Sequence, residues 1–300
     1  MSGPLHAALE KHSPLILDGA MGTELQRRGV DTGLPLWSAN ALLVHPEIVQ
    51  QIHADYIDAG AHIITANTFR TTRRTMRRGN LPDRSQPLTR MALEVAHKAR
   101  DSRPDHDVLI AGSVAPLEDC YRPDLVPGEN ELQDEHGELA ERLAAGGADF
   151  ILAETMGTIR EAKAACTAAI STSKEVVVSF ICNTAGALYS GESLRDAVIE
   201  ISKLQPAGIS LNCVSPRYLH SPLTILLDGV RSQKNLLIGV YGNIGLPESE
   251  KTGWEFTRDV SEKEYETTAR EWIRAGATMI GGCCGTTPDY IRALAGIAVQ

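Results

Sequence analysis

The chain has 300 residues, of which 43% are hydrophobic and 22% are charged, and its formal net charge is -9. This composition is typical of a globular protein with a full apolar core, and the acidic balance argues against nucleic-acid binding, which requires a basic patch. No apolar run approaches the length of a membrane span, and the start of the chain lacks the pattern of a secretion signal, so we expect a cytoplasmic protein.

Short apolar runs recur along the whole chain. Most are rich in valine and isoleucine and are too short for helices, a pattern typical of parallel strands that are buried on both faces. The eight runs are Leu15–Asp18, His62–Ala66, Val108–Val114, Asp149–Glu154, Val176–Cys182, Gly208–Cys213, Leu237–Tyr241 and Thr278–Gly282.

Amphipathic stretches follow these runs and predict helices, because apolar residues recur in them at three- and four-residue spacing. The eight predicted helices are Glu47–Ala59, Thr89–Arg100, Glu135–Ala145, Thr158–Ser171, Leu194–Leu204, Leu219–Ser232, Glu262–Ala275 and Pro288–Ile297. Three of them end in a glycine at the position where a helix C-cap adopts a left-handed conformation, in Asp58-Ala59-Gly60, Ala145-Gly146-Gly147 and Arg274-Ala275-Gly276.

Eight strands alternating with eight helices fit either a closed barrel or a doubly wound open sheet. No dinucleotide-binding glycine pattern follows the first strand, and the even count favours the barrel. We therefore expect an α/β protein with a single (β/α)8 TIM barrel, formed as one domain by residues 1–300. The stretches 20–46 and 115–133 are longer than usual barrel loops, and we expect them over the active-site face.

A basic cluster follows the second run. It contains Arg70, Arg73, Arg74, Arg77 and Arg78. A charge run of this kind is usually a solvated helix face or loop, and the alternative is a contact with an anion or a substrate tail.

Three cysteines lie at the ends of two predicted strands. Cys283 and Cys284 end the eighth run, and Cys213 ends the sixth. Strands six and eight are two apart around a barrel, so these thiols can converge at its C-terminal mouth, where barrel enzymes place catalytic groups. Adjacent strand residues point to opposite faces, so the chain must leave strand geometry at the cysteine pair, and the flanking glycines permit this.

Three thiolates with one open position are typical of a catalytic zinc site, and soft sulfur ligands favour Zn²⁺ over magnesium or calcium. The alternative is that the three cysteines are small buried hydrophobes. Cys120, Cys166 and Cys182 keep that interpretation, with Cys182 the nearest of them to the site. A zinc held by three thiolates is a poor Lewis acid for carbonyls, but it can bind a further thiol and remove its proton. The expected chemistry is attack of that thiolate on a methyl group carried by a positively charged sulfur or nitrogen.

Five segments, in this order along the chain, resemble the homocysteine S-methyltransferase family. They are Asp18-Gly19-Ala20-Met21-Gly22-Thr23-Glu24-Leu25, Thr65-Ala66-Asn67-Thr68-Phe69, Glu154-Thr155-Met156, Asn212-Cys213 and Gly281-Gly282-Cys283-Cys284-Gly285-Thr286-Thr287-Pro288. That family includes the betaine–homocysteine and S-methylmethionine–homocysteine methyltransferases and the homocysteine module of cobalamin-dependent methionine synthase. The family fold is a (β/α)8 barrel.

The resemblance implies roles for individual residues. Cys213, Cys283 and Cys284 match the zinc thiolates. Asp18 and Glu154 match carboxylates that hold the amino group of homocysteine, and an ammonium does need carboxylates beside it. The turn at Gly19 offers backbone N–H groups to the substrate carboxylate. Asn243 matches a residue near the zinc in some relatives, where it fills the open position before the substrate arrives.

The chain departs from the family pattern around Asn243, in Leu246–Val260 and in the loop 115–133, which leaves the donor open among S-methylmethionine, betaine, dimethylsulfoniopropionate and S-adenosylmethionine. The partners we expect are therefore a small thiol acceptor and a methyl donor, and the oligomeric state stays open. One alternative keeps the site with another thiol or selenol as acceptor. Another, of a different class, is a zinc- or thiol-binding module, or a subunit that needs a corrinoid partner protein. A complete methionine synthase does not fit this length.

Overall fold

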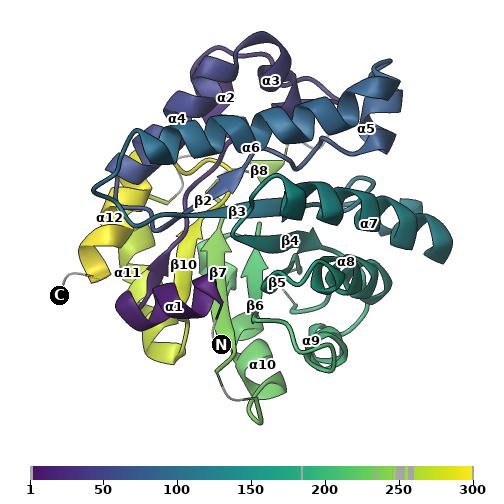
Figure 1. Ribbon diagram of the computed structural model, residues 1–300. Coiled ribbons are helices and arrows are strands. Elements are labelled where there is room, and N and C mark those ends of the chain that lie inside the picture. Colours follow the sequence, from purple (N-terminus) through teal and green to yellow (C-terminus); the bar gives the residue numbers. More distant parts are fainter. Residues whose placement is uncertain are drawn as a thin grey trace.

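A parallel sheet of eight strands forms the centre of the computed structural model, which describes residues 3–183, 185–233, 235–244, 246–247, 254–255 and 260–298 (Figure 1). The strand order is β1-β10-β7-β6-β5-β4-β3-β2, and a parallel bridge between Leu17 and Ile63 brings the two edges together. The predicted (β/α)8 barrel is therefore confirmed. The strands are β1 Leu15–Ile16, β2 Ile63–Ala66, β3 Leu109–Val114, β4 Phe150–Met156, β5 Val176–Phe180, β6 Gly208–Asn212, β7 Leu237–Gly242 and β10 Met279–Gly282.

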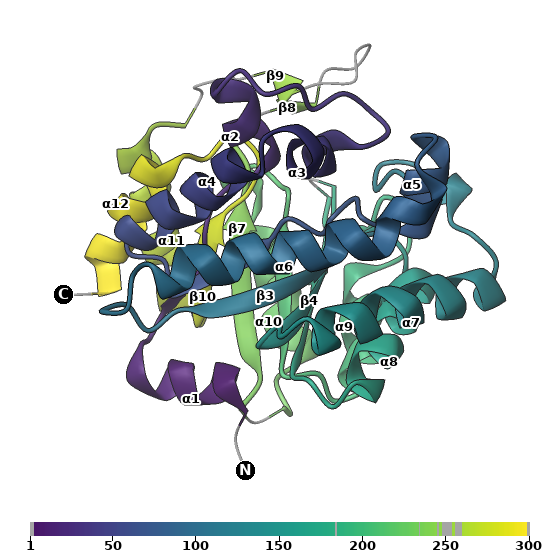
Figure 2. The same cartoon turned by 45° about the horizontal axis from the view of Figure 1, so that its top comes forward.

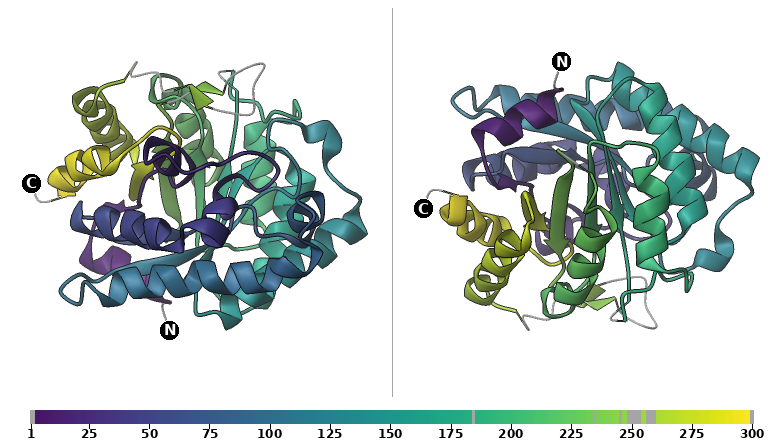
Figure 3. Two further views of the ribbon diagram at one scale, coloured as in Figure 1. Left: turned by 90° about the horizontal axis from the view of Figure 1, so that it is seen from above. Right: turned by 90° about the horizontal axis from the view of Figure 1, so that it is seen from below.

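The predicted helices surround this sheet, as the view along the barrel shows (Figure 3). They are α4 Pro46–Asp58, α6 Ser85–Asp101, α7 Glu129–Ala145, α8 Ile159–Ser171, α9 Leu194–Ser202, α10 His220–Gly229, α11 Glu262–Ala275 and α12 Pro288–Ala298. The expected left-handed glycines after three of them are confirmed, with φ of 100° at Gly60, 85° at Gly147 and 127° at Gly276. No described helix is long and apolar enough to cross a membrane.

Four α-helices of the described residues were not predicted. The helix α1 (Pro4–Lys11) lies at the end of the barrel where the strands begin, and its Leu5 packs into the interior apolar cluster. Figure 2 shows α2 (Gly22–Arg27) and α3 (Asn40–Val44) at the opposite end, where the strands finish. The expectation that the long loop after β1 covers this face is therefore confirmed. Of the divergent segment Leu246–Val260, most lies outside the described residues; its described part includes a two-stranded ribbon of β8 (Leu246–Pro247) and β9 (Trp254–Glu255).

The fourth unpredicted helix, α5 (Arg73–Arg78), carries the basic cluster. Arg74 pairs with three carboxylates, at 3.1 Å to Glu118, 2.7 Å to Glu131 and 2.6 Å to Glu135. Arg78 also pairs with Glu118. The expected solvated face is wrong for Arg74, because its side chain is only 20% exposed. These ion pairs attach α5 to α7 and to the loop that follows β3.

Side chains alternate between two apolar layers along each strand. On β4, Ile151 and Ala153 pack outward against the helices, whereas Phe150 and Leu152 fill the barrel interior. Glu154 is the next residue in the inward series, at the end of the strand where the barrel opens. The same two-residue step from an interior apolar residue leads to Thr65, Ser113 and Ser179. The C-terminal end of the barrel interior is therefore polar.

Candidate metal and substrate site

The three predicted cysteines meet at the C-terminal mouth of the barrel. Their sulfur atoms all lie within 4.8 Å of one another, and the Cys213 and Cys283 sulfurs are 2.9 Å apart. Cys213 directly follows β6, and Cys283 and Cys284 directly follow β10, with only β7 between these two strands. Cys283 and Cys284 are partly exposed as residues, and Cys213 lies deeper. The sequence prediction that they converge is consistent with this geometry.

Local backbone geometry turns both thiols of the adjacent pair toward one point. The Cys283 N–H donates to the Gly242 carbonyl at 2.8 Å, and the chain then turns at Gly285, which has a φ of 87°. The Thr286 hydroxyl donates to the Cys283 carbonyl at 2.7 Å and fixes this turn. The chain thus leaves strand geometry where the sequence required it.

Cys213 itself has a φ of 55°, a conformation that costs a side-chain-bearing residue roughly 1–2 kcal/mol. Its neighbour Asn212 is fully buried and supplies the restraint that holds it. The Asn212 side-chain oxygen accepts from the Thr155 N–H at 3.1 Å and from the Ser179 hydroxyl at 2.7 Å, and its amide donates to the Thr155 hydroxyl at 2.8 Å. Asn212 therefore connects the ends of β4, β5 and β6 beside the cysteine cluster.

The three thiols share negative charge unevenly. The pKa of Cys283 lies well below its usual range because Cys213 and Cys284 donate hydrogen bonds to its sulfur. The hydrogen bond to Cys283 also raises the pKa of Cys213, because the Cys213 thiol must keep its proton to donate it. When one thiol of such a close cluster is ionised, its negative charge disfavours ionisation of the other two, unless a cation binds between them. A divalent metal that prefers thiolates fits this donor set.

Two buried carboxylates lie near the thiols. Asp18, just after β1, accepts hydrogen bonds from the Thr65 N–H at 2.7 Å and the Thr65 hydroxyl at 2.8 Å. Glu154, on β4, accepts from the Ser113 hydroxyl at 2.5 Å. The pKa of Asp18 is raised to about 7 and that of Glu154 to about 8, mainly by burial and in smaller part by the charge of Cys283.

Asp18 also raises the pKa of Glu154, so the two carboxylates lie within electrostatic reach of each other. Neither forms a salt bridge within the described part of the chain. Two buried carboxylates without a cation are costly in their ionised form, which is why their pKa values are raised, and a cation bound between them would stabilise the ionised form. The site is therefore suited to a ligand that carries a positive group.

Gly19 and Asn243 also lie at this mouth. A Cβ atom at Gly19 would come within 2.8 Å of both the Thr286 hydroxyl and the Tyr56 ring, so only glycine allows the loop after β1 to approach the cysteine turn. Asn243 is buried, and its N–H donates to the Val214 carbonyl at 3.1 Å. The next residue, Ile244, donates to the Cys284 carbonyl at 2.9 Å. Asn243 is thus held between the two cysteine segments.

Several polar residues of the site were given no role in the sequence analysis, although Thr65 and Asn212 belong to the segments that resemble the family. Thr65, Ser113 and Asn212 hold the carboxylates or the cysteine segment through the hydrogen bonds above. The signal for the first two was available, because each lies two residues after an inward-facing apolar residue of its strand. Asn212 ends an apolar run beside Cys213 and carried a weaker signal of the same kind.

Of the three other cysteines, which were expected to be small core residues, two are buried and one is not. Cys166 and Cys182 are buried in the core, and burial raises the pKa of each to about 12. Cys120, which the sequence places among the core residues, is instead partly accessible on the loop after β3. It lies close enough to Cys283 for that charge to raise its pKa.

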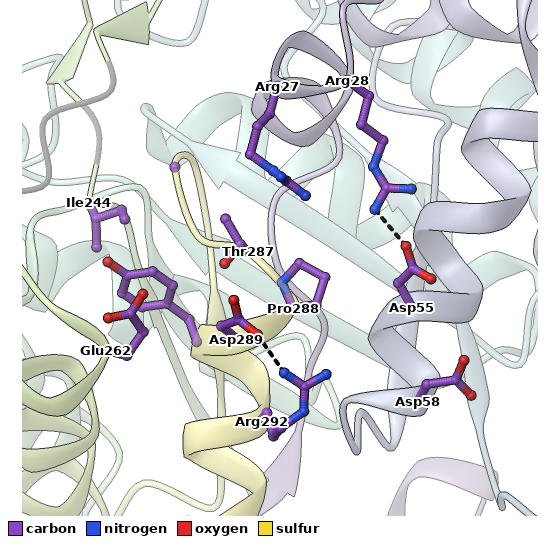
Figure 4. Close-up of a pocket in the computed structure, with 12 residues that line it drawn as sticks. Arg27, Arg28, Asp55, Asp58, Ile244, Glu262, Thr287, Pro288, Asp289 and Arg292 are labelled. Atoms are coloured by element: carbon purple, nitrogen blue, oxygen red, sulfur yellow. Dashed lines mark hydrogen bonds and ion pairs between the residues drawn. The ribbon is translucent and has the colours of Figure 1, made fainter.

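A separate cavity of about 820 Å³ is lined by residues from α2, α4 and α12 and from the segments beside them (Figure 4). Gly285 and Ile244 line part of it, but none of the three cysteines does. Several of its charged side chains pair with one another, for example Arg28 with Asp55 at 2.6 Å and Arg292 with Asp289 at 2.5 Å. We therefore place the chemistry at the cysteine cluster and not in this cavity.

Comparisons with known proteins agree with this placement. A family model described as homocysteine S-methyltransferase matches residues 15–298. Homocysteine S-methyltransferase 2 of Zea mays is 33% identical over 303 residues, covering 93% of this chain and 88% of that one. Selenocysteine Se-methyltransferase of Brassica oleracea var. italica is 30% identical over 305 residues, covering 93% and 87%. The metallated form of the homocysteine methyltransferase MmuM from Escherichia coli superposes with a TM-score of 0.82 at 30% identity, covering 98% and 100%.

Proposed function

The chain belongs to the homocysteine S-methyltransferase family, and from that premise we propose that it moves a methyl group from a small onium donor to the sulfur of homocysteine, giving methionine, at a Zn²⁺ ion held by Cys213, Cys283 and Cys284. Methyltransferase activity follows from the family. The observation that carries the finer proposal is the meeting of three thiols and two buried carboxylates at one barrel mouth.

The donor set supports zinc, because three soft sulfur ligands leave one of four positions for a substrate. When bound, zinc lowers the pKa of a thiol at that position and leaves its sulfur nucleophilic. The chain's own residues do the rest. Asn212 and the Thr286 hydroxyl keep the cysteine segments in place, and Asn243 is held between these segments.

Asp18 and Glu154 bind the ammonium of the amino acid. A cation between them stabilises the ionised form of both, so substrate binding lowers their raised pKa values and releases the protons they carry near neutral pH. The backbone N–H groups of the turn at Gly19 bind the substrate carboxylate. The acceptor is thereby held at both ends of its amino acid part, with its sulfur directed to the cysteines.

Selenocysteine is a second candidate acceptor, because a relative that is 30% identical is named a selenocysteine Se-methyltransferase. Its selenol offers the same soft, easily ionised group beside the same ammonium and carboxylate. The residues described above bind parts that both amino acids share, so they support either acceptor.

The experiment is a donor panel with metal analysis on the same sample. We expect about one zinc per chain and methyl transfer to homocysteine from S-methylmethionine, betaine, dimethylsulfoniopropionate or S-adenosylmethionine. Selenocysteine is tested in parallel as acceptor. Turnover that appears only after a corrinoid protein is added would contradict the proposal, as would a zinc-free protein with full activity.

A further inference from the structure

One buried hydroxyl at the barrel mouth belongs to Tyr241, the last residue of β7 that points into the barrel interior. Its ring lies in the same interior cluster as Leu237, four residues earlier on the strand. The residue is 2% exposed, and its hydroxyl forms no hydrogen bond of ordinary geometry within the described part of the chain. A buried polar group without a partner is costly, so such a group at a binding site indicates a hydrogen bond that the ligand completes.

Backbone pairing places Tyr241 in the middle of the proposed site. β7 lies between β6 and β10, the two strands that end at the cysteines. Tyr241 is in register with Asn212 on one side and with Gly281 on the other. Its ring also belongs to the interior cluster against which Cys283 packs. The strand register therefore fixes Tyr241 beside both cysteine segments.

The Tyr241 hydroxyl approaches Glu154, whose Oε1 atom accepts from the Ser113 hydroxyl at 2.5 Å. Burial raises the pKa of Tyr241, and the charge of Glu154 raises it further. In turn, the tyrosine hydroxyl lowers the pKa of Glu154, which means that it stabilises the ionised carboxylate. A tyrosine hydroxyl can donate and accept at once. The Tyr241 oxygen can therefore accept a hydrogen bond from a group that binds beside Glu154.

We propose that the Tyr241 hydroxyl accepts one hydrogen bond from the ammonium of the acceptor, as the third acceptor beside Asp18 and Glu154. This inference deepens the proposed function and rests on it. An ammonium has three N–H donors, and two carboxylates bind only two of them if each accepts one. A neutral oxygen satisfies the third without adding negative charge to a site that already contains two carboxylates and three thiols. Tyr241 thereby favours an amino acid over a simple thiol as acceptor.

Tyr241→Phe tests this role, because it removes the hydroxyl and keeps the ring that fills the barrel. The free protein loses a polar atom that has no partner, so the variant should melt at or above the temperature of the wild type. The bound substrate loses a hydrogen bond to a charged group, so the affinity for homocysteine should fall at least about tenfold. A residue with a purely structural role would not give this combination.

Homocysteine and 4-mercaptobutyrate, which is homocysteine without its amino group, locate the effect within the substrate. Both affinities are measured by calorimetric titration of the zinc-loaded protein without a methyl donor. Tyr241→Phe should weaken the binding of homocysteine and leave that of 4-mercaptobutyrate at the wild-type value. The two ligands share the thiol and the carboxylate, so a loss confined to homocysteine places the hydroxyl at the ammonium.

Tyr290→Phe is the matched control. Tyr290 is buried as well, but it lies on α12, and its hydroxyl donates to the Val260 carbonyl at 2.7 Å. This variant loses a hydrogen bond that the free protein already makes. It should therefore melt below the wild type and keep both affinities.

Wild-type affinity of Tyr241→Phe for homocysteine would overturn the inference and leave the proposed function intact. An equal loss for both ligands would also overturn it, because the hydroxyl would then act on the thiol or the carboxylate. The expected binding pattern in a protein that transfers no methyl group from any donor would contradict the proposed function. The place of Tyr241 in amino-acid binding would then still stand.

Discussion

Replacing Cys213, Cys283 or Cys284 singly with serine is expected to remove bound metal and to lower methyl transfer by at least about 10³-fold. A serine hydroxyl does not ionise near neutral pH and is a hard ligand, so it cannot take the place of a thiolate on zinc. Metal content by mass spectrometry and turnover with homocysteine, measured on the same preparations, give the result.

Cys166→Ser is the matched control. Cys166 is buried on α8 and is not part of the cluster, so this variant should keep its metal. Its stability should fall only because a polar hydroxyl is placed in the core. Full activity in any of the three cluster variants would show that the cysteine in question is a packing residue. Loss of metal in the control as well would mean that the effect comes from unfolding.

Asp18→Asn and Glu154→Gln are expected to weaken homocysteine binding by roughly 10²-fold or more each, because truncating one partner of a buried charge pair costs about 2–5 kcal/mol. The amides keep the size of the side chains and can still bond to Thr65 and Ser113. Titration calorimetry measures the affinity. Asp289→Asn, an equivalent change at an exposed carboxylate that pairs with Arg292, should leave it unchanged.

The same two variants should gain stability in the absence of substrate. The pKa of Asp18 rises from 3.8 in an unfolded chain to about 7, so the folded state favours the protonated carboxyl. This contribution is present in full below pH 4 and is lost as the pH rises from there to about 7. At about 1.36 kcal/mol for each pKa unit, the ionised carboxylate destabilises the free protein above pH 7 by up to about 4 kcal/mol.

Thermal unfolding at several pH values measures the difference in stability between each variant and the wild type. Asp18→Asn should melt above the wild type at pH 8, and the difference should shrink toward pH 4. For Glu154, whose pKa rises from 4.5 to about 8, the difference should appear above about pH 4.5 and reach its full size only near pH 8. Homocysteine at a concentration that just saturates the wild type should narrow the difference at pH 8, because the variants bind it more weakly and gain less stability from it. An Asn variant that melts below the wild type at pH 8 would contradict the account of these carboxylates.

Much of the barrel could be predicted because its strands are buried on both faces. Such strands appear as continuous apolar runs, and the glycines at 60, 147 and 276 mark where helices return to them. The helix α5 was not predicted, because the carboxylates that pair with its arginines lie 40 to 61 residues further along the chain. The helix α1 is short, and its Leu5 is buried only because the barrel end lies above it.

In the site too, some residues could be predicted from local sequence patterns and others could not. The cysteines, Asp18 and Glu154 directly follow or end predicted strands, so the barrel itself brings them together. Cys120 and Tyr121 lie within the loop 115–133, whose path depends on contacts with Arg70, Arg74 and Gly157 that no local pattern encodes. The part of the site at the strand ends therefore follows from the sequence pattern, whereas the path of the surrounding loops does not.

Zinc-edge X-ray absorption of the wild-type protein, before and after addition of homocysteine, tests the central claim most directly. The account predicts three sulfur ligands and one lighter ligand in the protein as purified, and four sulfur ligands once homocysteine is saturating. A sulfur count that stays the same on saturation, with methyl transfer still proceeding, would contradict the proposal that the cysteine cluster holds the substrate thiolate through zinc.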